Sequence, residues 1–137
     1  MFGLSRLARY LPKERLERII YLMATRVLEQ YPELGDLARR IGRSAQIQIY
    51  NEFGDEANIW LGVKDGEPVV SRGFHPATNT IRMHIDVFLD IVEGKIDFRQ
   101  AVAHGVVEIQ SHDGLPWFYH FALWASFFDK IKRLLGR

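Results

Sequence analysis

The spacing of apolar residues changes at Gly42, and this change constrains the fold more than any other feature of the chain. Over residues 13–30, apolar side chains recur every three or four positions, which is the spacing of one face of an α-helix. Pro32 begins a second, shorter segment of this kind, which is expected to run to about Ile41 and to end at Gly42. Residues 45–51, AQIQIYN, instead alternate apolar and polar side chains, which is typical of a half-buried strand. The chain is therefore expected to combine helices with a sheet.

Both spacings recur along the rest of the chain, and 137 residues suffice for one core but not for two. We therefore predict a single α+β domain, in which a mostly antiparallel sheet of five strands is covered by helices. A Lys-Asp-Gly-Glu turn between two apolar runs indicates a hairpin over 57–73. The remaining predictions are a strand at 79–85, a helix that Gly94 ends, a short helix that Asp97 caps and Gly105 ends, a strand within 106–114, and a long helix from Trp117 to about Leu135.

The last predicted helix is rich in aromatic residues, seven of which fall within residues 114–131. A membrane-spanning helix needs about 20 apolar residues without ionisable groups. Pro116, His120 and Asp129 exclude that interpretation here. On a helix the aromatic side chains form one wide stripe, and two interpretations of it stay open: the stripe fills the core against the sheet, or it shapes an apolar pocket.

A Trp-bearing strand that ends in Asp-Gly, a strand that leads into a helix, and a Gly-Lys-x-Asp turn before a second short helix follow one another in this chain. This order resembles the sterol carrier protein 2 family over about residues 45–114. The matching positions are Trp60, Asp65, Gly66, Asp86, Phe88, Leu89, Gly94, Lys95, Asp97, Ala101, Gly105, Val107 and Ile109. The resemblance implies a lipid-binding domain over 44–137, on which an N-terminal helical segment, 1–43, packs.

The resemblance also implies a function, which is the non-enzymatic binding or transfer of an apolar lipid of the sterol, fatty acyl or polyprenyl type. The lipid is expected in a cavity between sheet and helices. The alternative is a protein-interaction module, or a homodimer, that uses the aromatic C-terminal helix as its contact surface. The residues expected to line the cavity are Trp60, Ile81, Met83, Phe88, Val92, Trp117, Phe121, Trp124 and Phe128.

The net charge of +1 conceals an uneven distribution of charged residues. Residues 1–43 carry nine basic against five acidic side chains, residues 130–137 carry four against none, and residues 44–129 carry five against twelve. Basic ends either are solvated faces or attract an anionic membrane, and apolar residues such as Phe2 and Leu7 among the N-terminal arginines favour peripheral membrane contact. Nucleic acid is not an expected partner, because the strand region is acidic.

The residues that most catalytic and metal sites require are missing or scattered. The chain has no cysteine, its five histidines show no metal-binding spacing, and it contains no glycine-rich nucleotide-binding motif. We therefore predict no catalytic residue, metal or cofactor. The N-terminus lacks the apolar run of a signal peptide, so a cytoplasmic location is expected.

Overall fold

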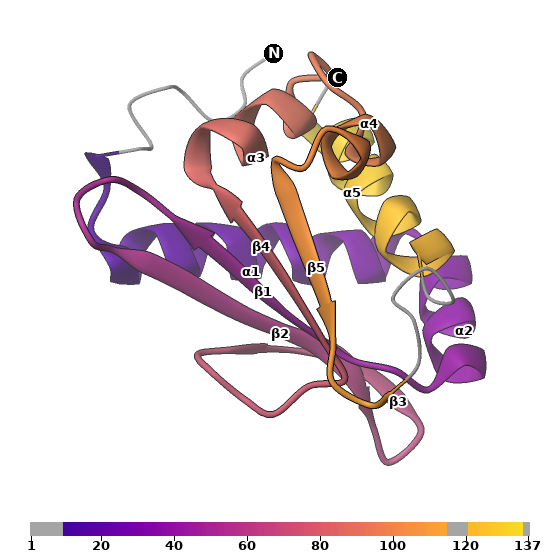
Figure 1. Ribbon diagram of the computed structural model, residues 1–137. Helices are drawn as coiled ribbons and strands as arrows, with labels where there is room; N and C mark the ends of the chain where they lie inside the picture. Colours follow the sequence, from indigo (N-terminus) through magenta and orange to yellow (C-terminus); the bar gives the residue numbers. More distant parts are fainter. Residues whose placement is uncertain (1–9, 115–120, 136–137) are drawn as a thin grey trace.

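The computed structural model describes residues 10–114 and 121–135 (Figure 1). Helices and strands follow one another in the predicted order. The elements are α1 (Lys13–Gln30), α2 (Pro32–Ile41), β1 (Ala45–Tyr50), β2 (Glu56–Lys64), β3 (Glu67–Arg72), β4 (Asn79–His84), α3 (Ile85–Val92), α4 (Phe98–Ala103), β5 (Val107–Ser111) and α5 (Phe121–Leu135).

The five strands form one sheet in the order β3-β2-β1-β4-β5. The pairs β3–β2, β2–β1 and β4–β5 are antiparallel, whereas β1 and β4 are parallel. The parallel pair arises because the chain leaves β1 through the β2–β3 hairpin and returns along the other side of β1. The predicted fold class, an α+β domain with a mostly antiparallel five-stranded sheet, is confirmed.

Helices cover one face of this sheet, and the core lies between them and the strands (Figure 1). Helix α1 packs on β2 and β3, and α5 contacts α1, α2, α3 and α4. Alternate residues of each strand face this core, as Ile47, Ile59 and Ile81 do at one level of the sheet. Because α1 and α2 bury apolar residues in the same cluster as the strands, the segment 1–43 and the rest of the chain share one core wherever the structure describes them.

Local chemistry explains where several elements end. Gly42 follows α2 in the left-handed conformation, which costs glycine little. The β2–β3 turn places Asp65 and Gly66 at φ 51° and 81°, the positive values of a tight hairpin turn. Asp97 begins α4 in a capping box with Gln100, as its predicted role requires. The predicted start of the last helix, at Trp117, lies outside the described residues.

Candidate functional site

Most of the residues predicted to line a cavity are packed together in the core. Phe121 is half-buried and stacks on Phe98, with ring centroids 5.8 Å apart, and Trp117 lies outside the described residues. The six predicted residues that are buried on the helix-covered side of the sheet are Ile81, Met83, Phe88, Val92, Trp124 and Phe128, each at most 3% exposed. Their role in holding a ligand stays a prediction.

Trp60 does not join this group, because it lies on the opposite face of the sheet. It pairs with Gln46, whereas its neighbours Ile59 and Leu61 face the core. The Trp60 Nε1–H donates to the carbonyl oxygen of Pro76 at 2.9 Å, so the indole lies beneath the loop between β3 and β4. The strand period of two places adjacent residues on opposite faces, which separates Trp60 from the other predicted lining residues.

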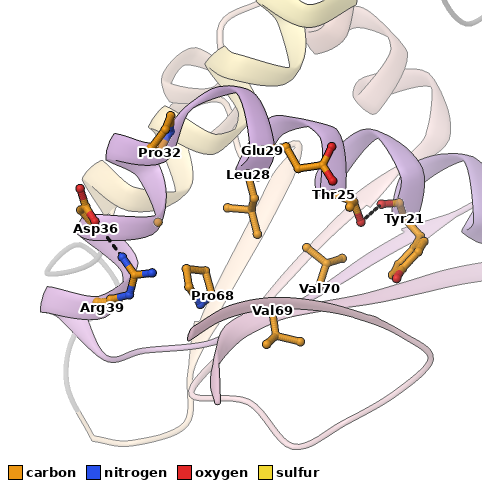
Figure 2. Close-up of a pocket in the computed structure, with 11 residues that line it drawn as sticks. Tyr21, Thr25, Leu28, Glu29, Pro32, Asp36, Arg39, Pro68, Val69 and Val70 are labelled. Carbon is orange, nitrogen blue, oxygen red and sulfur yellow. Dashed lines mark hydrogen bonds and ion pairs between the residues drawn. The ribbon is translucent and has the colours of Figure 1, made fainter. Parts of the chain in front are cut away.

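A cleft of about 560 Å³ opens between α1, α2 and the edge strand β3 (Figure 2). Leu28, Pro68 and Val70 are among its apolar lining residues, and Gly35 lets α2 lie close to the strand. A Cβ atom at Gly35 would lie 3.0 Å from Cγ of Pro68, tighter than most real contacts. The other residues that line the cleft are Tyr21, Thr25, Glu29, Pro32, Asp36, Arg39 and Val69.

Each charged side chain of the cleft has an ion-pair partner. The Arg39 guanidinium donates from Nη1 to Asp36 Oδ1 at 2.7 Å and from Nη2 to Glu67 Oε1 at 3.2 Å, and its Nε–H donates to the carbonyl oxygen of Gly66 at 2.8 Å. Figure 2 shows the Asp36–Arg39 pair at the end of the cleft formed by α2. Glu29 lies on the α1 side, and its Oε1 is 4.0 Å from Nε of Arg26.

A small apolar crevice of about 10 Å³ adjoins this cleft, because Leu28 and Pro68 line both spaces. Trp124 of α5 also lines the crevice and is fully buried. Its Nε1–H has no hydrogen-bond partner among the described residues. An unpaired buried donor costs about 1–3 kcal/mol. The remaining residues that line the crevice are Leu34, Ala38, Arg43, Leu61, Gly62 and Leu123.

No local sequence pattern pointed directly to the cleft. Its residues come from two helices and an edge strand, and each belongs to a pattern that also fits an ordinary packed surface. The Pro32 to Gly35 turn is the one local hint, since a proline and a glycine at the start of α2 let that helix lie close to β3.

Residues 10–114 and 121–135 contain neither a cluster of metal-binding side chains nor a membrane-spanning helix. In this part of the chain no three His, Asp or Glu side chains are grouped so that they could hold a metal ion. None of the described helices has the length and apolar character needed to cross a membrane.

Comparisons with known proteins place this architecture. No protein-family model matches the sequence, and no curated protein matches it. Among solved structures, the apo form of sterol carrier protein 2 from Yarrowia lipolytica superposes with a TM-score of 0.61 at 16% identity, covering 87% of this chain and 91% of that one. The chain has the sterol carrier protein 2 fold.

Two more solved structures of this fold are similar to the chain. The sterol carrier protein domain 2 of Helicoverpa armigera gives a TM-score of 0.59 at 16% identity, covering 100% of this chain and 97% of that one. The UbiJ-SCP2 ubiquinone synthesis protein gives 0.58 at 15% identity, covering 87% and 97%. At the level of the sterol carrier protein 2 fold, the resemblance found in the sequence is confirmed.

Proposed function

We propose that the protein binds or transfers an apolar lipid, without catalysing a reaction, between its helices and its sheet. The observation that carries this proposal is the cleft beside β3, which adjoins an apolar crevice lined by Trp124. Proteins with the same fold support this proposal, because two of them are named sterol carrier proteins and one a ubiquinone synthesis protein. Fold alone does not determine function, so the site carries the argument.

The dimensions and lining of the cleft suit such a ligand. A volume of about 560 Å³ lies within the range of small-molecule sites, which is about 300–1,000 Å³. Each Å² of apolar surface removed from water contributes about 25 cal/mol before the costs of association. An apolar chain in the cleft would lie against Val70 and Leu28, and Leu28 also lines the crevice. Trp124, which was predicted to line the lipid cavity, lines this crevice.

The alternative, docking through the aromatic helix, has less support. The large side chains of the described part of α5 are buried within the chain itself, with Trp124, Phe127 and Phe128 at most 1% exposed. A surface that is already buried against α3 and α4 offers little area to a partner.

Loading of the carrier would take place at an anionic membrane. The outward side of α1 carries Arg15, Arg18 and Arg26 around Leu22, which is 54% exposed. Arg15, Arg18, Ile19 and Leu22 line a shallow depression of about 380 Å³. Cations around an exposed apolar side chain suit an anionic lipid surface, and the cleft lies along the flank of the same helix. Of the N-terminal residues predicted to contact a membrane, Phe2 and Leu7 lie outside the described residues.

Filling the cleft tests the proposed function. Thr25→Trp would place an indole among the residues that line it, and Arg99→Trp would place the same group on the exposed surface of α4 as a control. The fluorescent lipid alcohol pyrenedecanol is titrated with the parent and both variants, and circular dichroism checks folding. We expect Thr25→Trp to weaken binding by on the order of tenfold, which corresponds to about 1.4 kcal/mol. The proposal fails if the parent does not bind the probe, or if both variants bind it as the parent does.

A further inference from the structure

We propose that the cleft selects lipids whose polar head donates a hydrogen bond and carries no negative charge, such as a long-chain or polycyclic alcohol, over fatty acids and lipid phosphates. This inference rests on the proposed function and names the class of ligand. It follows from the pairing of the charged groups around the cleft.

Arg39 is the only cation among the described residues that line the cleft, and it is already engaged. Each of its three guanidinium nitrogens donates to an oxygen of the protein, two of them to the carboxylates of Asp36 and Glu67. One positive charge thus faces two negative ones. A fatty acid that bound to Arg39 would have to displace a carboxylate that already occupies the same donor.

The other cations near the cleft are engaged as well, and Arg43, which lines the adjoining crevice, pairs with Asp113. Glu29 adds a third carboxylate, and Arg26 is its nearest ion-pair partner at 4.0 Å. Lys64 lies opposite Glu67 in the hairpin, but its ammonium lies over the Trp60 ring, 5.5 Å from the centroid, on the other face of the sheet. With three carboxylates against two guanidinium groups, an anionic head would lose water without gaining a free partner.

A hydroxyl head fits the same surroundings better. Carboxylates accept hydrogen bonds and cannot donate them when ionised, so Glu29 is suited to a head that donates. The Thr25 hydroxyl donates to the carbonyl oxygen of Tyr21 at 2.9 Å, which leaves its own oxygen as an acceptor facing the cleft (Figure 2). The cleft therefore presents acceptors to its ligand.

The experiment compares hexadecanol with palmitate, which have the same chain length, as competitors of pyrenedecanol at neutral pH. We expect the parent to bind hexadecanol at least about tenfold more tightly than palmitate. The variant Asp36→Asn/Glu67→Gln removes both carboxylates from Arg39 while their amide oxygens remain. Its palmitate affinity should rise by on the order of tenfold, and its hexadecanol affinity should change little.

Both replaced side chains are well exposed, at 67% and 74%, so the variant is expected to fold as the parent does. Glu93→Gln/Glu108→Gln removes the same net charge away from the cleft and should leave both affinities unchanged. Equal affinity of the parent for palmitate and hexadecanol, or an unchanged ratio in Asp36→Asn/Glu67→Gln, would overturn the selectivity. If neither competitor nor the probe binds the parent, the proposed function is rejected first, and the selectivity with it.

Discussion

At the scale of single residues, Trp60 and Gly62 depend on each other. They lie two positions apart on β2 and therefore share a face of the sheet, and the indole lies across the glycine. A Cβ atom at Gly62 would lie 2.5 Å from Cη2 of Trp60 and 2.9 Å from Cβ of Ser44, distances that real structures essentially never show. The glycine thus makes room for the ring, whose Nε1–H is fixed by Pro76.

We expect Gly62→Ala to destabilise the protein by about 1–3 kcal/mol, because an extra methyl group in a packed region forces its neighbours to move. The measurement is the midpoint of urea unfolding. The same substitution in a Trp60→Leu background should cost clearly less, since most of the crowding atoms are then gone. An equal loss in both backgrounds would contradict the packing account.

The position of Trp60 also shows a limit of sequence-based reasoning at this scale. In AQIQIYN the polar residues identify the outward face, whereas NIWLGV is apolar at nearly every position and leaves the faces of β2 ambiguous. Trp60 is buried outside the core because the β3–β4 loop covers it, and the same loop accepts from Gln46 Nε2 at the carbonyl oxygen of Gly73. An irregular loop carries no periodic signal, so its cover over the sheet was not predictable.

At the scale of elements, Glu17 joins α1 to the sheet. Strand β3 ends at Arg72, opposite Ile59, so the next backbone N–H of β2 on that edge, at Asn58, lacks a strand partner. Glu17 Oε2 accepts from it at 2.8 Å, although the residue is only 8% exposed. Arg72 strengthens the junction, because its Nη2 donates to the carbonyl oxygen of Glu14 and its Nε lies 3.8 Å from Glu17 Oε1.

Glu17→Ala should therefore cost about 1–3 kcal/mol of unfolding free energy, since it leaves a buried N–H without an acceptor. Glu17→Gln retains an acceptor oxygen and should cost less than Glu17→Ala. Chemical denaturation of the two variants in parallel measures the difference. If both lose the same amount, the hydrogen bond to Asn58 is not what attaches α1 to β2.

Elements were largely predictable, whereas their arrangement was not. The period of the apolar residues and the glycines at 42, 94 and 105 predicted the described helices and strands with nearly correct ends. Neither the parallel β1–β4 pair nor the cleft followed from them. Strand pairing depends on how the chain crosses the sheet, and the cleft depends on the distance between α2 and β3, which no local pattern encodes.

At the scale of the whole molecule, basic and acidic side chains lie on different surfaces. Three arginines of the basic N-terminal segment, Arg15, Arg18 and Arg26, lie on the exposed side of α1 around Leu22. The carboxylates of the middle segment include Glu67, which pairs with Arg39 beside the cleft. A cationic face beside an acceptor-lined cleft would hold the opening near an anionic membrane and leave charged headgroups outside it.

The last prediction tests this orientation with vesicles. The parent should co-sediment with vesicles that contain phosphatidylglycerol more than with neutral ones, and added salt should release it, because exposed charges are screened beyond about 8 Å at physiological ionic strength. Arg15→Gln/Arg18→Gln should weaken this binding by on the order of tenfold or more, since each arginine near the surface contributes about 1 kcal/mol. Lys95→Gln/Arg99→Gln removes the same net charge from the exposed surface around α4 and should bind nearly as the parent does. Equal losses in the two variants would attribute sedimentation to net charge alone and would rule out α1 as the docking face. Equal sedimentation of the parent with neutral vesicles would rule out electrostatic docking altogether.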